Sequence, residues 1–191
     1  MAELLLTSGL TVEGKYKFPD INAYAGDVLW VETENALYSE VFISTLFGLL
    51  KPSKGDLKFF ASDVSYCNVA DWAPQVKDAV SLCRLYAYSR GTQMSSSVNE
   101  LKRILSAANA EHILNMDLKD MVKSTRSMLS WAISLSVPAL NIILNDPYYG
   151  LDKEASVCLS RELDNCAKDG SLMIITSQDK PAVFNRQAVF R

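Results

Sequence analysis

Polar side chains that could do chemistry follow three apolar segments of the chain. The turn TENALYSEV, 33–41, follows the first segment, the pair Asn145-Asp146 ends the second, and Gln178 follows the third. Carboxylates at such places can act as acids, bases or ligands of a hard cation, and Glu40 with Asp146 is a conceivable metal pair. The glutamates of the turn equally suit a solvated loop, and we predict that the chain holds no metal.

The composition of the chain argues against several classes of function. The chain has 191 residues, 49% of them hydrophobic, and a formal net charge of −3 with no run of Lys or Arg, which predicts one globular domain and argues against nucleic-acid binding. The start of the chain has no pattern of a secretory signal. Zinc is not expected, because the only histidine is His112 and no C-x-x-C pair occurs among Cys67, Cys83, Cys158 and Cys166.

The elements that must position these groups alternate in type. Apolar, β-branched runs predict buried strands over Val28–Thr33, Ala79–Cys83, Asn141–Leu144 and Leu172–Ser177. Helical patterns cover Val41–Leu50, most of Ser95–Leu135, and Lys153–Lys168, with Gly170 as the C-cap of the last. This alternation predicts an α/β fold with a mostly parallel sheet flanked by helices. We expect a single domain over 1–191, with a helical subdomain inserted at approximately 84–136.

Three blocks of sequence carry a resemblance to a known family. They are GDVLWVETENALYSEVFISTLFGLLKPSKGDL (26–57), ALNIILNDPYYGLDKEA (139–155) and MIITSQD (173–179). In order and spacing they resemble the phosphate loop with its strand and helix, the Walker B strand with the D-loop, and the switch strand of the ABC-transporter ATPases. The resemblance implies a P-loop NTPase-like nucleotide-binding domain.

The same resemblance implies that the phosphate loop has lost its chemistry. A phosphate loop needs glycines that let backbone amides surround a phosphate, a Lys for the outer phosphates and a hydroxyl for magnesium. The aligned positions are Thr33, Ala36 and Tyr38 for glycine, Ser39 for the lysine and Glu40 for the hydroxyl, with Asn35 among them. Side chains resist positive φ, and Leu37 and Tyr38 add bulk. We therefore expect no nucleotide cofactor.

The charges of the turn also argue against nucleotide binding. Glu32, Glu34 and Glu40 crowd the place where the family binds a polyanion. Two like charges about 4 Å apart repel by roughly 1 kcal/mol in water and about 4 kcal/mol at an intermediate effective dielectric constant. Without the lysine, tight triphosphate binding is hard to recover.

The other motif positions are also altered. By resemblance, Asn145 replaces the carboxylate that supports magnesium, Asp146 replaces a longer catalytic Glu, and Gln178 replaces the switch His. The signature motif falls on Met121–Thr125, with Ser124 or Thr125 as the expected helix N-cap. We therefore assign no catalytic residue to the chain.

Some family features remain recognisable. Gly150-Leu151-Asp152 resembles the D-loop, which lies along the family's dimer interface. Tyr148 and Tyr149 precede it and are either interface anchors, or one packs inward and the other is amphipathic surface. Tyr16 and Phe18 are candidates for stacking on adenine, although core packing suits them better. The segment Arg84–Arg90 is expected near the groove that receives a permease helix in this family.

The sequence therefore predicts an ABC ATPase-like subunit that is not an enzyme. Its expected partners are an active ABC ATPase subunit, a membrane permease or both, or a second copy of itself. It is expected in the cytoplasm, reaching the inner face of the membrane only through a permease. Two alternatives are a scaffold independent of transport that reuses the dimer surface, and an unusual active ATPase.

Overall fold

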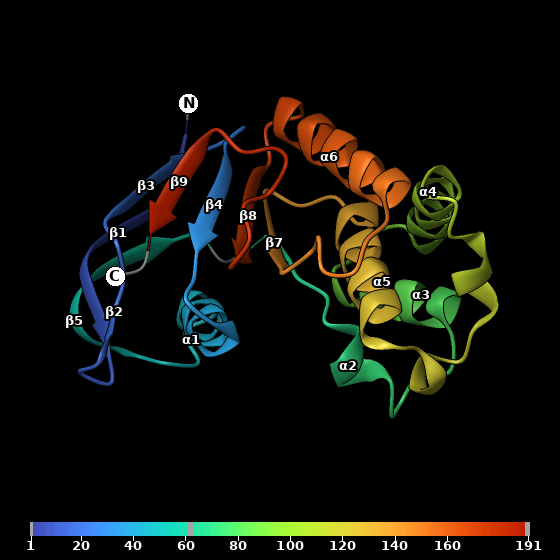
Figure 1. The fold of residues 1–191 in the computed structure, drawn as a ribbon, viewed down its shortest axis with the longest axis horizontal. Coiled ribbons are helices and arrows are strands. Elements are labelled where there is room, and N and C mark those ends of the chain that lie inside the picture. Colours follow the sequence, from blue (N-terminus) through green and yellow to red (C-terminus); the bar gives the residue numbers. More distant parts are fainter. Residues whose placement is uncertain (1, 61–62, 190–191) are drawn as a thin grey trace. The chain divides into compact units, whose positions relative to one another are not determined.

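The computed structural model describes residues 2–60 and 63–189 and divides into two compact units. The first, called the sheet unit, contains the chain up to Val64, Ala139–Asp146 and the chain from Leu163 onward. The second, called the helical unit, contains Ser65–Pro138 and Pro147–Glu162. Figure 1 shows the strands of the first unit and the helices of the second.

A parallel sheet forms the core of the sheet unit. Its strand order is β6 (Val64–Ser65), β7 (Asn141–Asn145), β8 (Leu172–Ser177), β4 (Val28–Glu32) and β9 (Arg186–Val189). Strands β7, β8, β4 and β9 run parallel to one another. Every residue of β8 is buried, as expected for a central strand covered on both faces. The predicted α/β fold with a mostly parallel sheet flanked by helices is confirmed.

A second sheet in the same unit is antiparallel, and most of its strands were not predicted. Strand β1 (Glu3–Val12) pairs with β2 (Tyr16–Lys17) and β3 (Ile21–Tyr24), and also with β5 (Pro52–Phe59). Most of β5 is exposed, and β1 alternates only partly between buried and exposed positions. Such strands lack the continuous apolar run that marks β4, β7 and β8 in the sequence.

The helices agree with the sequence in type and differ from it in several bounds. Helix α1 runs over Ala36–Leu46, earlier than expected, and α6 over Lys153–Lys168 as predicted. The helical unit contains α2 (Val69–Trp72), α3 (Ala79–Ser89), α4 (Met94–Ala107) and α5 (Lys123–Ser136), with 3-10 turns η1 (Glu111–Asn115) and η2 (Leu118–Asp120). Within the described residues, no helix is long and apolar enough to cross a bilayer.

The strand predicted over Ala79–Cys83 is wrong, because these residues begin helix α3. Asp78 caps this helix, and its Oδ1 accepts from the backbone N–H of Ser81 at 2.8 Å. The buried positions of α3 are Ala79, Leu82, Cys83, Tyr86 and Ala87. They recur at helical spacing, so a helix rather than a strand explains the apolar residues that suggested β structure.

A buried carboxylate links α4 to α6 in the helical unit. The Glu162 side chain is only 5% exposed and accepts from Nη1 and Nη2 of Arg103 at 3.1 and 2.6 Å. Arg161 Nη2 lies 3.3 Å from Glu162 Oε1. Hydrogen bonds to Glu100 and Glu162 hold the pKa of Arg103 above its ordinary value. The buried charge of Glu162 is therefore compensated by two arginines.

Arg103→Met is expected to lower the free energy of unfolding by about 2 kcal/mol, because it removes the better partner of a buried carboxylate. The estimate lies below the usual range for breaking a buried pair, since Arg103 is partly exposed and Arg161 still contacts Glu162. Urea denaturation followed by circular dichroism measures the loss.

Glu100→Gln is the matched control, because it removes the exposed partner of the same arginine. Its expected cost is at most about 1 kcal/mol, as for other exposed ion pairs. Equal losses for the two variants would contradict the role given to the buried pair.

Candidate functional site

The turn after β4 is held by hydrogen bonds within the sheet unit. Thr33 is buried, and its N–H donates to the carbonyl of Ser177 on β8 at 3.1 Å. The Thr33 hydroxyl lies 2.9 Å from the hydroxyl of Ser39, which is also buried. The position that resembles the family's lysine is thus a buried serine bonded to its own loop, and it offers no cation.

Asn35 caps helix α1 and uses the amides that start the helix. Its backbone is extended (φ −163°, ψ 171°), and its Oδ1 accepts from the N–H groups of Leu37 at 3.0 Å and Tyr38 at 3.2 Å. The first amides of a helix are the donors that bind phosphate in such loops. In this chain a side-chain carboxamide already accepts from two of them.

The sequence did not lead us to predict the capping role of Asn35, which we named only as an aligned position of the phosphate loop. The signal was present, because Asn before a run such as Ala36-Leu37-Tyr38 is a preferred start of a helix. The helix predicted from Val41 therefore begins five residues earlier, at Ala36.

Aromatic rings pack beneath this turn. Tyr38 meets Tyr16 edge to face, with ring centroids 5.2 Å apart, and Phe18 packs on Phe42 at 5.5 Å. Tyr16 and Phe18 are both buried, which confirms their interpretation as core residues. Leu37 was expected to add bulk inside the turn, but its side chain is 52% exposed.

The glutamates of the turn differ in their surroundings. Glu32 Oε2 accepts from Gln187 Nε2 at 2.8 Å, whereas Glu34 and Glu40 are exposed. In the part of the chain that the structure describes, no group of three or more His, Cys, Asp or Glu residues is placed to hold a metal ion. Exposed carboxylates repel each other only weakly in water, so the upper repulsion estimate does not apply to Glu34 and Glu40.

The ends of β7 and β8 carry the other candidate residues. Asn145 Oδ1 accepts from the hydroxyl of Thr176 at 3.0 Å, and the Asp146 N–H donates to the Thr176 carbonyl at 2.7 Å. Asp146 has φ of 48°, which few residues other than glycine and Asn or Asp adopt. Gln178 Nε2 donates to the carbonyl of Glu34. The structure thus brings Gln178 to the turn after β4 and bonds Asn145 to β8.

The two adjacent tyrosines have different environments in the helical unit. Tyr148 is half-buried, and its hydroxyl lies 3.1 Å from that of Ser160 on α6. Tyr149 is 42% exposed, and Lys123 Nζ lies 4.0 Å from its ring centroid. This fits the interpretation in which one ring packs inward and the other is amphipathic surface. A contact of Tyr149 with a partner protein stays a prediction.

Hydrogen bonds and a glycine conformation shape the rest of the D-loop-like segment. Asp152 caps α6, since its Oδ1 accepts from the Ala155 N–H at 2.8 Å. Leu151 is half-buried, and its N–H donates to the Tyr148 carbonyl at 3.3 Å. Gly150 has φ of 66°, and a Cβ added there would lie 2.7 Å from Cβ of Ser124 on α5. Only glycine fits this close approach.

The expected N-cap of the signature-like helix is wrong. Helix α5 begins at Lys123, so Ser124 and Thr125 lie inside its first turn, and the cap position is Val122, with no side-chain hydrogen bond. The sequence favoured a serine or threonine cap because these types usually lead at that position. The contact with Gly150 instead places Ser124 against the D-loop-like segment.

Comparisons with known proteins identify the fold. No family model matches the sequence, and no curated protein matches it. Among solved structures, an inward-facing conformation of an ABC transporter is 14% identical and superposes with a TM-score of 0.77, covering 100% of this chain and 80% of the other.

Two further structures agree with that match. The ADP conformation of an ATP-binding cassette of an ABC transporter is 13% identical, with a TM-score of 0.70 over 100% of this chain and 88% of that one. A protein of Clostridium perfringens that is part of an ABC transporter complex is 17% identical, with a TM-score of 0.64 over 94% and 80%. The chain therefore has the fold of ABC ATPase domains.

Asn35→Ala is expected to destabilise the chain by about 1 kcal/mol, because two first-turn amides lose their acceptor. Asn35→Asp keeps an acceptor and should stay within a few tenths of a kcal/mol of the parent. Urea denaturation measures both, and an alanine variant as stable as the parent would show that the cap contributes nothing.

Gly150→Ala should cost more stability than Gly91→Ala, although both glycines have nearly the same φ, 66° and 67°. Each alanine carries the strain of a left-handed residue, about 1–2 kcal/mol. Gly91 faces open space, whereas Gly150 meets Ser124 Cβ, which is fixed to the α5 backbone. The clash should add roughly 1–3 kcal/mol. Equal thermal shifts in the two variants would disprove the close contact.

Proposed function

We propose that this chain is a catalytically inactive, ABC ATPase-like subunit that acts as a structural or regulatory partner of other proteins. It neither holds nor hydrolyses ATP efficiently, and it carries no nucleotide or metal cofactor. Its partners are an active ABC ATPase subunit, a membrane permease or both, or a second copy of itself. It works in the cytoplasm and meets the membrane through a permease.

One observation carries the proposal: Asn35 accepts from the first-turn amides of α1 where a phosphate would be expected to bind. A phosphate that entered would have to displace this cap and would find no lysine, because that position is Ser39. A hydrogen bond to a charged group contributes roughly 1.5–3 kcal/mol, so losing the lysine alone weakens binding by about 10- to 150-fold. The residues present do not fit magnesium-bound ATP.

The groups that would support hydrolysis are also committed elsewhere. The neutral carboxamide of Asn145 accepts from Thr176, and a neutral amide is a weaker ligand than a carboxylate for a hard cation. Gln178 donates to the backbone of Glu34 and has no proton to exchange near neutral pH. Asp146 remains an acid, which leaves one candidate base without the cation that would position a nucleotide.

The features that remain support a role in protein contacts. Tyr149 is exposed beside Lys123, and Gly150, Leu151 and Asp152 keep an ordered backbone. An aromatic ring with a cation above it has the composition of an interface anchor. The proposed interface therefore contains Tyr148, Tyr149 and the three residues that follow.

Titration of the full chain with a fluorescent ATP analogue should give no saturable binding below millimolar concentration, with or without magnesium. The reason is that the position of the lysine holds Ser39 and that Asn35 already accepts from the N–H groups of Leu37 and Tyr38. An intact ABC ATPase measured in parallel shows that the assay works, and circular dichroism shows that the chain is folded. Magnesium-dependent binding at micromolar concentration would overturn the proposal.

Two further outcomes separate the alternatives. Magnesium-dependent hydrolysis that disappears in Asp146→Asn would establish an active ATPase. A stable homo-oligomer in light scattering that co-purifies with neither an ATPase nor a membrane subunit would favour the scaffold. Co-purification with an intact ATPase or a permease supports the proposed subunit.

A further inference from the structure

The outer edge of strand β5 carries no partner strand in the sheet unit. Strand β5 pairs with β1 and has, among the described residues, no second strand beside it (Figure 1). Residues 56–59 pair in an unbroken register with residues 5–8 of β1. Gly55, with φ of 78°, lies where this register ends. An open strand edge offers its N–H and C=O groups to another strand.

Alternate residues of β5 direct their backbone groups to opposite sides. The N–H of Phe60 donates to the carbonyl of Leu4 on β1 at 3.2 Å. In an antiparallel pair the even-numbered residues of this stretch therefore bond to β1, and Leu57 and Phe59 direct their N–H and C=O groups outward. The side chains of Leu57 and Phe59 are only half-buried. A second strand at this edge would bond to both backbones and cover both apolar side chains.

Charged side chains alternate in sign on the exposed face of the same edge. Lys54, Asp56 and Lys58 are all exposed and lie two positions apart. The β1 residues opposite the last two are uncharged, since Asp56 lies opposite Ser8 and Lys58 opposite Leu6. Lysine at an edge usually discourages a second strand. Here an acid between two lysines makes the edge complementary to a copy of itself.

Charge selects one register for such a pair. Paired residues of an antiparallel sheet share a face, so an odd-numbered residue must lie opposite an odd-numbered one. A two-fold axis through Leu57 places Asp56 opposite Lys58 of the second copy, and does so twice. An axis through Asp56 or through Lys58 would place two like charges directly opposite each other, which is destabilising.

We propose that two copies of this chain pair through β5 in antiparallel orientation, with a two-fold axis at Leu57. The N–H and C=O groups of Leu57 bond to those of Leu57 in the second copy, and the two side chains cover each other. Phe59 lies opposite Gly55 of the second copy, which has no side chain to compete for the space. One short strand pair is a small interface, so the dimer is weak and forms at high chain concentration.

This inference goes beyond the proposed function and can fail separately from it. Strand β5 belongs to the sheet unit, whereas residues 148–152 of the proposed partner interface belong to the helical unit. Pairing through β5 requires neither the loss nor the presence of nucleotide binding. A weak, concentration-dependent dimer also differs from the stable homo-oligomer that would favour a scaffold.

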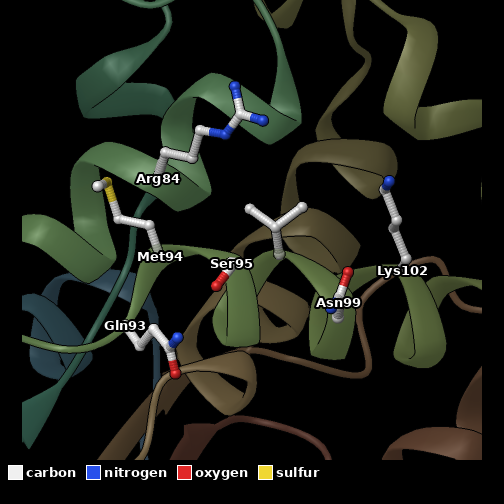
Figure 2. A pocket seen from close by; sticks show the side chains of 7 residues that line it. Arg84, Gln93, Met94, Ser95, Asn99 and Lys102 are labelled. Atoms are coloured by element: carbon white, nitrogen blue, oxygen red, sulfur yellow. The ribbon is translucent and has the colours of Figure 1, made fainter.

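Sedimentation equilibrium of the full chain measures the self-association. The dimer fraction of the parent should rise with concentration. Asp56→Lys and Lys58→Asp should each raise the dissociation constant by about tenfold, because each makes both cross-strand pairs repulsive. Lys102→Asp is the matched control, since it makes the same charge change on an exposed residue of α4 in the helical unit (Figure 2). It should change the dissociation constant less than about twofold.

Mixtures of variants test the register itself. Chains with Asp56→Lys and chains with Lys58→Asp carry opposite charges at both pairs, so they should bind each other about as tightly as the parent binds itself. Asp56→Lys mixed with Lys102→Asp has the same total charge but keeps one lysine pair, and it should bind about threefold or more weakly. With one chain isotopically labelled, the NMR amide shifts should lie in β5 and β1.

Four results would overturn the inference. They are a parent that stays monomeric at millimolar concentration, equal dissociation constants for Lys58→Asp and Lys102→Asp, equal affinities in the two mixtures, and amide shifts outside β5 and β1. Circular dichroism shows whether each variant is folded. If a single variant unfolds, Asp56→Lys/Lys58→Asp replaces it, and this exchange of the two charges should self-associate as the parent does.

Discussion

Helix α1 begins after a turn of three residues that follows strand β4, and its first amide groups need an acceptor. Asn35 supplies that acceptor from within the chain, through one oxygen that takes the N–H groups of Leu37 and Tyr38. A helix N-terminus can be satisfied by a side chain or by a bound anion. A cap of this kind stabilises a helix by about 1 kcal/mol. The two amides therefore have an acceptor without any ligand. An anion that binds these amides must displace the Asn35 side chain, which is part of the same chain and always close to them.

Other polar groups of the site also form hydrogen bonds within the chain. The Thr33 and Ser39 hydroxyls bond to each other, and Gln178 donates to the backbone of the turn. The buried hydroxyls of Thr33 and Ser39 would cost free energy if they were left without a partner, so the bond between them stabilises the turn. These bonds support the proposal that the turn after β4 is a structural corner between a strand and a helix.

The sequence predicted β4, β7 and β8 because strands buried on both faces are continuous apolar runs. Helix α3 was mistaken for a strand because five apolar or small residues cannot distinguish the two periods. At the site, residue types and the resemblance predict that the lysine and glycines of a phosphate loop are replaced, and this stays a prediction. The contact of Gly150 with Ser124 could not, because it depends on the approach of two backbones that are 26 positions apart in the chain.

The proposed loss of nucleotide binding requires the chain to be stable without a nucleotide. Ligand binding adds stability only in proportion to the logarithm of ligand concentration over the dissociation constant, so a chain with a very weak site gains almost nothing from ATP. The compensating interactions must lie inside the polypeptide. Glu162 with its two arginines is one such interaction in the helical unit, and the Tyr16 and Tyr38 pair is another in the sheet unit. Tyr38, which by resemblance aligns with a phosphate-loop glycine, packs its ring on the buried Tyr16.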